Sequence, residues 1–253
     1  MSKFSNAVAA AIACGLAMVA TGCGARGEAA STPTSTLPQG GEQLKLDPSN
    51  FTTKIDNPYW PMAPGDRWVY RETSGSGPAG RAVARVTRER KRVAAGITGL
   101  VVHDRLTRSG RIVEDTLDWF AQDRAGNVWY LGEATKEYAG GKVRSTHGSW
   151  EAGVHGAQAG VVMPAHPRVG MTYRQEYLEG EAEDQARVLS RNAHARVPFG
   201  AFGHMLLTAE TSPLEPEVVE HKLYARGVGP VAARDVRGDS DRSVLLRYTR
   251  GRR

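Results

Sequence analysis

Turn-forming residues recur at short intervals along the whole chain, and this spacing is the strongest constraint on its fold. The 253 residues include 29 glycines and 13 prolines, residue types that favour turns over the interior of helices. Clear turn signals between apolar runs are Ser109-Gly110, Ala125-Gly126-Asn127, Gly140-Gly141, Gly227-Val228-Gly229 and Gly238-Asp239-Ser240. Short connections join antiparallel strands, because parallel strands need long crossovers. The chain is therefore expected to be mainly β.

Apolar and β-branched stretches between these turns are the expected strands. They are Arg67–Thr73, Arg81–Glu89, Leu100–Thr107, Ile112–Ala121, Asn127–Leu131, Met171–Leu178, Met205–Thr211, Val218–Ala225, Pro230–Val236 and Ser243–Thr249. The alternation is clearest where Leu100, Val102 and Leu106 share one face. Glu181–Asn192 is compatible with either a helix or a strand. We predict one antiparallel β-domain over residues 51–253, a barrel or a strongly curved sheet with little helix.

The first 22 residues have the layout of an export signal. Lys3 is their single charged side chain, and residues 7–20 form an apolar run. This run is shorter than the ~20 residues that a membrane-spanning helix needs. It ends in Ala20-Thr21-Gly22-Cys23, which resembles the lipobox of bacterial lipoproteins, although that motif usually has Leu where this chain has Ala20. The resemblance implies cleavage before Cys23, a diacylglyceryl anchor on its sulfur and an extracytoplasmic location on the cell membrane.

An ordinary cleaved signal peptide, with Cys23 as an incidental thiol, is the alternative. Residues 23–50 then follow as a flexible tether, rich in Gly, Ala, Ser, Thr and Pro, and about 27 such residues have a root-mean-square reach of roughly 29 Å. The other cysteine, Cys14, leaves with the signal, so we expect no disulfide or cysteine nucleophile in the exported domain. Since the net charge is +6, anionic lipids or envelope polymers are expected partners rather than nucleic acid.

A proline-rich aromatic segment, Ile55–Tyr70, leads into the first expected strand. Its prolines favour extended backbone, on which Tyr59 and Trp60 could form a platform for a ligand. The alternative is a segment that covers the open end of the sheet. The aromatic members of the candidate ligand-binding set are Tyr59, Trp60, Trp68, Trp119, Trp129 and Trp150.

Polar residues interrupt two apolar faces of the expected strands. Asp115 and His221 each lie between apolar residues two positions away on either side. A buried carboxylate and imidazole on facing strands could take shifted pKa values, as groups in active sites do. With Glu176 as a third candidate, these residues could bind a ligand, or they could serve an envelope hydrolase. Motifs such as GxSxG, Walker A and HExxH do not occur, so we predict no catalytic residue and no cofactor.

The longest expected loop is Gly148–Gly170, which shows no clear periodicity. Long loops often have functional roles, and His155 and His166 in this loop, with His147 just before it, could bind a metal. A solvated loop is the favoured interpretation, and we predict no metal site.

Several stretches resemble an uncharacterised family of secreted bacterial lipoproteins. They are Ile55–Tyr70, Leu117–Asp123, Gly148–Gly153, Arg174–Tyr177 and Thr211–Pro216. The resemblance spans about residues 50–245, and it implies a single extracytoplasmic domain without supplying catalytic residues. The expected function is a lipid-anchored, non-catalytic binding protein for a lipophilic small molecule or a cell-envelope partner. A structural envelope lipoprotein that acts through its surface is the further alternative.

Overall fold

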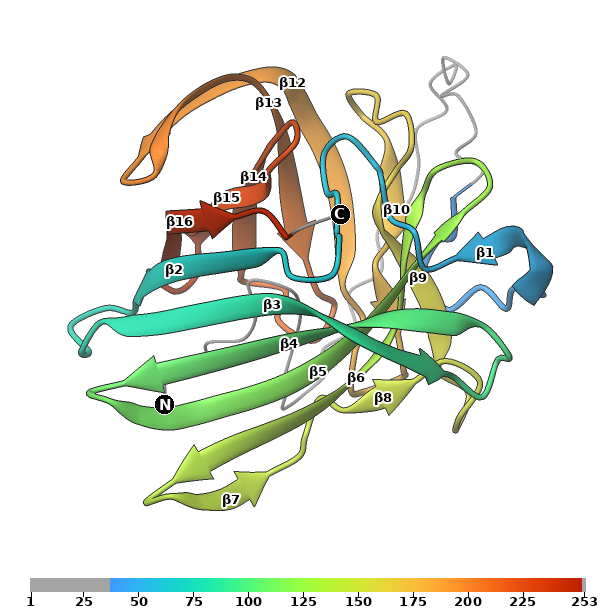
Figure 1. The fold of residues 1–253 in the computed structure, drawn as a ribbon, viewed down its shortest axis with the longest axis horizontal. Coiled ribbons are helices and arrows are strands. Elements are labelled where there is room, and N and C mark those ends of the chain that lie inside the picture. The colour runs from blue at the N-terminus through green and yellow to red at the C-terminus, as the bar shows by residue number, and fades with distance from the viewer. Residues whose placement is uncertain (1–36, 252–253) are drawn as a thin grey trace, which may run out of the picture.

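A computed structural model describes residues 37–251 as an antiparallel sheet rolled into a nearly closed barrel (Figure 1). The strands follow the order β10-β12-β13-β14-β15-β16-β2-β3-β4-β5-β6-β9-β11. The predicted mainly β fold is confirmed. The predicted export signal, Cys23 and the first part of the tether lie outside the described residues. The described part was wrongly predicted to be flexible, since Arg174 donates to the carbonyls of Gly40 and Glu42, both at 2.7 Å, and Leu44 and Leu46 pack against the core. Within residues 37–251, no helix is long and apolar enough to cross a membrane.

The strands are short to medium in length, and most are joined to the next by tight turns. Those of the main path are β2 (Arg67–Thr73), β3 (Gly80–Arg92), β4 (Thr98–Arg108), β5 (Arg111–Asp123), β6 (Val128–Ala139), β9 (Gln158–Met163), β10 (Thr172–Arg174), β11 (Glu176–Tyr177), β12 (Gln185–Val197), β13 (Gly200–Thr211), β14 (Val219–Ala225), β15 (Gly229–Arg237) and β16 (Arg242–Thr249). A 3-10 turn, Pro48–Asn50, precedes β1 (Phe51–Thr52), while β7 (Lys142–Ser145) and β8 (Trp150–Glu151) pair with β6.

Each predicted strand coincides with a strand or strand pair of the barrel, and two predictions need correction. Glu181–Asn192 lies mostly in β12, so the strand alternative was right and the helix alternative was wrong. The predicted loop Gly148–Gly170 contains β8 and β9, so it was wrong to treat it as one long loop. The apolar residues of β9 are buried where the two edges of the sheet meet, which we call the seam of the barrel. Both faces of the strand are covered there, so its sequence need not alternate between apolar and polar residues.

The chain closes the barrel by crossing from one edge of the sheet to the other. β10 and β11 are separated by Gln175 alone, and they pair with β12 and β9, respectively. Arg174, which is buried, donates from its guanidinium to the Ala159 carbonyl of β9 at 2.9 Å. β9 passes so close to this crossing that a Cβ on Gly160 would collide with the backbone of Gln175. The seam therefore depends on a glycine and on a buried arginine.

The barrel interior is apolar at one end and acidic at the other, and β5 shows the change along a single strand. Its inward residues run from Glu114 through Thr116 and Asp118 to Phe120. Phe120 stacks on Tyr130 of β6 with ring centroids 4.9 Å apart. Since successive side chains of a strand alternate between faces, the apolar neighbours of Asp115 point out of the barrel.

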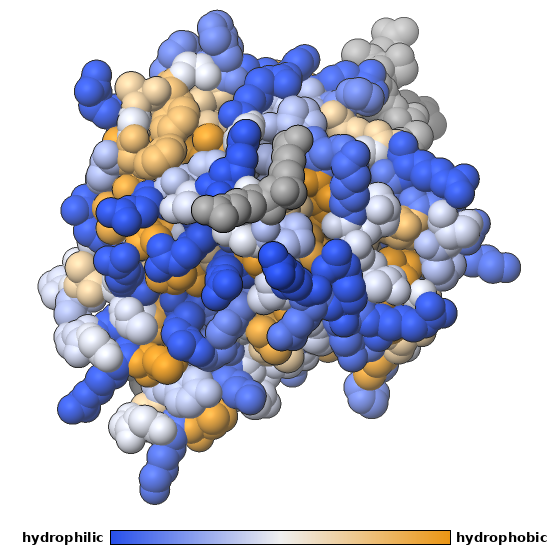
Figure 2. Space-filling model, in the orientation of Figure 1, coloured by the Kyte–Doolittle hydropathy of each residue, from blue (hydrophilic) through white to orange (hydrophobic). Residues whose placement is uncertain are grey.

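The outer surface is largely hydrophilic, with apolar side chains gathered over the end of the β12–β13 hairpin (Figure 2). Phe199 in this hairpin is 38% exposed, and its ring stacks on Phe202 with centroids 6.2 Å apart. Exposed apolar side chains on this scale are normal for a folded domain. This hairpin therefore gives no reason by itself to assign a binding surface.

Candidate functional site

Trp60 and Trp68 from the candidate aromatic set belong to the packed end of the barrel. Trp60 lies with its ring centroid 5.7 Å from those of Phe120 and Tyr224. The Trp68 indole donates to the Val228 carbonyl at 2.7 Å. The apolar cavity beside them holds only about 10 Å³, about the smallest space that can take one water. A lipophilic ligand has no room at these two side chains.

The remaining tryptophans have separate partners. Trp119 faces outward beneath the Lys91 ammonium, 5.1 Å from the ring centroid. The Trp129 indole donates to Asp123 at 2.8 Å, and the Trp150 indole donates to Glu176 at 2.9 Å. The structure thus brings Trp150 and Glu176 together and does not gather the predicted aromatic set around one ligand.

The three residues of the hydrolase alternative do not converge. Asp115 faces outward and accepts from His103 at 2.7 Å and from Arg105 at 2.8 Å. His221 also faces outward on β14, which five strands separate from β5 along the sheet. Burial and the Arg234 charge lower its pKa. Glu176 lies inside the barrel. General acid–base chemistry needs such groups within reach of one substrate, so this hydrolase arrangement is wrong.

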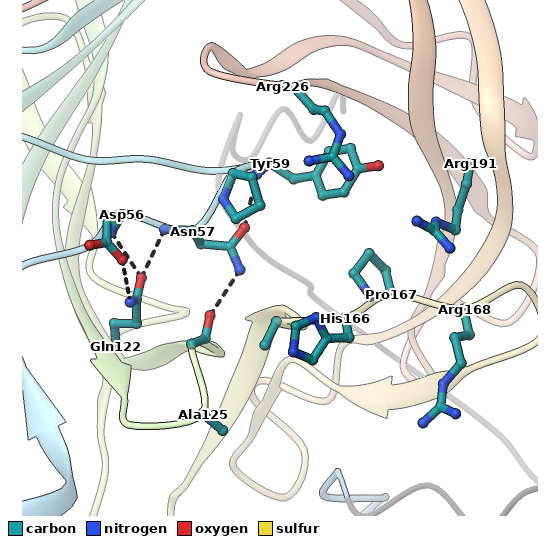
Figure 3. Close-up of a pocket in the computed structure, with 13 residues that line it drawn as sticks. Asp56, Asn57, Tyr59, Gln122, Ala125, His166, Pro167, Arg168, Arg191 and Arg226 are labelled. Carbon is teal, nitrogen blue, oxygen red and sulfur yellow. Dashed lines mark hydrogen bonds between the residues drawn. The ribbon is translucent and has the colours of Figure 1, made fainter.

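A pocket of about 740 Å³ opens where the Pro58–Tyr59 segment covers the barrel (Figure 3). Four other parts of the chain contribute to it: the end of β5 with its following turn, the loop after β9, strand β12 and the β14–β15 turn. The lining residues are Asp56, Asn57, Pro58, Tyr59, Gln122, Ala125, Gly126, Ala165, His166, Pro167, Arg168, Arg191 and Arg226.

One wall of this pocket is held by buried amide side chains. Gln122 Oε1 accepts from the backbone N–H groups of Asp56 and Asn57, both at 2.9 Å. The Asn57 amide donates to the carbonyls of Gly126 at 2.9 Å and Pro164 at 3.1 Å. Because Asn57 and Gln122 are both buried, these bonds fix the covering segment against the β5–β6 turn and make the wall rigid.

Cationic side chains dominate the opening of the pocket. The Arg226 guanidinium lies over the ring of Tyr59, 4.5 Å from its centroid. Figure 3 shows Arg191 and His166 turned toward the same opening, whereas the guanidinium of Arg168 points away from it. Stacking uses the flat face of a guanidinium and leaves its edge N–H donors for other partners. Within residues 37–251, none of these four cationic or imidazole side chains forms an ion pair.

Asp56, the carboxylate among the lining residues, already has hydrogen-bond and ion-pair partners. Asp56 accepts from the Gln122 amide at 2.8 Å and lies 3.4 Å from the Lys54 ammonium. These contacts, the Gln122 hydrogen bond first, lower the pKa of Asp56. Among residues 37–251, the pocket therefore presents positive charge without an ion-pair partner, together with a carboxylate that already contacts Gln122 and Lys54.

Sequence reasoning identified Tyr59 and the segment around it but missed the arginines. Arg191 and Arg226 come from different strands and turns, and no spacing in the sequence relates them. His166 was weighed as a metal ligand, yet no group of three potential ligands gathers among the described residues. The one available signal was the proline-rich segment Ile55–Tyr70, which indicated a cover over the end of the sheet.

Comparisons with known proteins support no assignment of this chain. No protein family matches the chain, and no curated protein matches it. A crystal structure of a candidate lipoprotein from Parabacteroides distasonis is similar, with 13% sequence identity and a TM-score of 0.41. The alignment covers 76% of this chain and 98% of that one. A likeness this remote supports no argument about function.

Proposed function

We propose that this protein is a lipid-anchored, extracytoplasmic and non-catalytic binding protein that takes an anionic group in its end pocket. The main support is that Arg191, Arg226 and His166 surround one opening of about 740 Å³. The pocket's own carboxylate, Asp56, is engaged by Gln122 and Lys54. A ligand with a phosphate or carboxylate group would supply the missing counter-charge.

The chemistry of the guanidinium group favours these ligands. Its planar N–H donors match phosphate and carboxylate oxygens, and such charge-assisted hydrogen bonds each contribute roughly 1.5–3 kcal/mol. The stacking of Arg226 on Tyr59 holds one guanidinium in place before a ligand arrives, which lowers the entropy cost of binding. The overall charge of +6 would attract an anionic ligand from a distance.

The anchor and location rest on the Cys23 motif and on the tether that follows it. Two or three acyl chains hold a protein durably on a bilayer, whereas one chain gives marginal binding. A domain on such a tether would meet phosphate and carboxylate groups of envelope lipids and polymers. These are the partners that the pocket's charge suits.

The test is a calorimetric titration of the full chain, purified in mild detergent, with inorganic phosphate and with citrate. We expect binding that weakens about tenfold in Arg191→Gln and in Arg226→Gln, because each change removes a charged hydrogen-bond donor. Arg187→Gln is the matched control, since Arg187 is an exposed arginine on the same strand as Arg191 and does not line the pocket. Absence of binding, or equal weakening in Arg187→Gln, would reject the proposal.

A further inference from the structure

Two of the groups of carboxylates in the acidic half of the barrel interior lie on different walls and can be compared. The first, on β13 and β14, holds its own cation: the Lys222 ammonium lies 2.7 Å from Glu210 and 3.1 Å from Glu220. The hydroxyls of Thr208 and Tyr224 also donate to Glu210, both at 3.0 Å. This group shows how the interior satisfies buried carboxylates, by pairing them with an ammonium and with hydroxyl donors.

The second group, on β5, β6 and β11, is Asp118, Glu133 and Glu176, which we call the inner acid cluster. Asp118 and Glu133 are directly opposite each other in the β5–β6 register, and all three residues are at most 2% exposed. Burial raises the pKa of each carboxyl. The field of Asp118 raises that of Glu133 further, and the fields of Asp184 and then Asp118 raise that of Glu176, although Trp150 and Lys222 act in the opposite direction. The three groups are therefore close enough to interact.

Only some of the carboxyl oxygens in the inner acid cluster have hydrogen-bond partners. Asp118 Oδ1 accepts from the Tyr130 hydroxyl at 2.7 Å, and Glu176 Oε2 accepts from the Trp150 indole at 2.9 Å. The other oxygens, Asp118 Oδ2 and Glu176 Oε1, have no hydrogen-bond partner among residues 37–251, and neither has Glu133 Oε2. In the same part of the chain, none of the three carboxylates forms an ion pair. Buried oxygens left in this way are costly unless something else binds them.

Aromatic rings border the same carboxylates. Tyr130 and Trp150 meet edge to face, with centroids 5.3 Å apart and planes at 89°. Ammonium and guanidinium groups bind favourably over such rings as well as to carboxylates. Toward the mouth of the barrel, Glu114 and Glu137 are cross-strand neighbours that are both accessible to solvent. Acidic side chains thus stand on β5 and β6 at the mouth and again at the cluster, and the buried hydroxyls of Thr116 and Thr135, 2.6 Å apart, lie between them.

We propose that the inner acid cluster binds an organic cation, a ligand with an ammonium or guanidinium group, entering past Glu114 and Glu137. The ligand would take the place at this cluster that Lys222 takes between Glu210 and Glu220. No group of three potential ligands within residues 37–251 is gathered closely enough for a metal ion, which favours a larger cation. This site is separate from the anion pocket and does not depend on it.

The probe is putrescine, an aliphatic diamine, titrated into the full chain in mild detergent and compared with 1,4-butanediol, its uncharged counterpart. We expect putrescine to bind and the diol not to bind. Glu133→Gln and Glu176→Gln should each weaken putrescine binding about tenfold, because each removes a carboxyl that can give up its proton and pair with the ammonium. Asp115→Asn is the matched control, since Asp115 lies on β5 but faces outward to His103 and Arg105.

A second readout separates loss of the site from loss of the fold. Glu133→Gln removes a buried carboxylate that has an unpartnered oxygen, so its free energy of unfolding at pH 8 should be no lower than that of the wild type. Arg191→Gln should bind putrescine normally, whatever happens to phosphate binding. No putrescine binding by the wild type, equal binding by Glu133→Gln and wild type, or displacement of putrescine by an equimolar amount of Mg²⁺ would each overturn the proposal.

Discussion

The Lys222 ammonium lies 2.7 Å from the Glu210 carboxylate inside the barrel, where both side chains are buried. Although burial lowers the pKa of Lys222, Glu210 and Glu220 raise it by more, so the side chain stays charged. An ion pair at this depth is costly to form and more costly to break, because the remaining charge has no water around it. The acidic end of the interior therefore depends on this one ammonium for part of its stability.

Lys222→Met is expected to lower the free energy of unfolding by about 3–5 kcal/mol. The change leaves Glu210 and Glu220 without their cation while keeping most of the buried apolar volume. Urea unfolding at pH 8 measures the loss. Lys142→Met, at an exposed position on β7, should change stability by less than about 0.5 kcal/mol. Similar effects of the two substitutions would show that the buried pair has no special role.

Stability should fall as the pH rises from about 5 to about 8, because the folded barrel holds protons that the unfolded chain releases. Burial, with a contribution from Asp104, raises the pKa of Glu72 to about 8, and burial raises that of Asp104 to about 6. Both values are above the ordinary values of 4.5 and 3.8. The folded state therefore binds more protons throughout this range, and urea midpoints should decrease with pH.

Glu72→Gln tests whether Glu72 contributes to this fall in stability with rising pH. Since glutamine does not titrate, the fall in stability between about pH 6 and about pH 8 should become shallower in this variant. Glu89→Gln, at an exposed position on β3, should leave the slope unchanged. Identical slopes in the wild type and Glu72→Gln would contradict the raised pKa of Glu72.

The strands were predictable from sequence, but the face that each strand turns inward was not. In β5 the apolar alternation placed Asp115 among the residues expected to face the core. The structure instead turns Asp115 and Leu117 outward, with Leu117 37% exposed, and turns Thr116 and Asp118 inward. Alternation shows which residues share a face, and it identifies the inner face only where the interior is apolar. In this barrel, half of the interior is acidic.

The candidate sites were predictable only in fragments. Tyr59 was identified from its proline-rich segment, and Trp150 and Glu176 were separately named as candidates. Arg226, which stacks on Tyr59, lies far away in sequence, and no local pattern pairs Trp150 with Glu176. Such contacts follow from strand order and register, which local pattern does not determine when sixteen strands share one sheet.

Gly160→Ala is expected to destabilise the seam of the barrel. The new Cβ would collide with the Gln175 backbone, at the crossing where β10 continues into β11. Overpacking of this kind costs about 1–3 kcal/mol, and a backbone neighbour cannot move aside as a side chain can. Urea unfolding measures the cost, and faster amide exchange at Glu176 and Tyr177 would locate it. Gly200→Ala, whose Cβ would find nothing nearer than 3.8 Å, should be nearly neutral.

Cys23→Ser should abolish acylation of the chain. The lipobox-like sequence Ala20-Thr21-Gly22-Cys23 predicts that the sulfur of Cys23 receives diacylglycerol, and serine offers no thiol for that bond. Expressed in a bacterium fed an alkyne-tagged palmitate, the wild type should be labelled and the variant should not. Cys14→Ser is the matched control, because Cys14 should be removed with the signal.

Without its acyl chains, Cys23→Ser should also lose durable membrane attachment once the leader is cleaved. Labelled Cys23→Ser, or an unlabelled wild type, would contradict the lipoprotein assignment and remove the reason for placing the anion pocket beside the envelope.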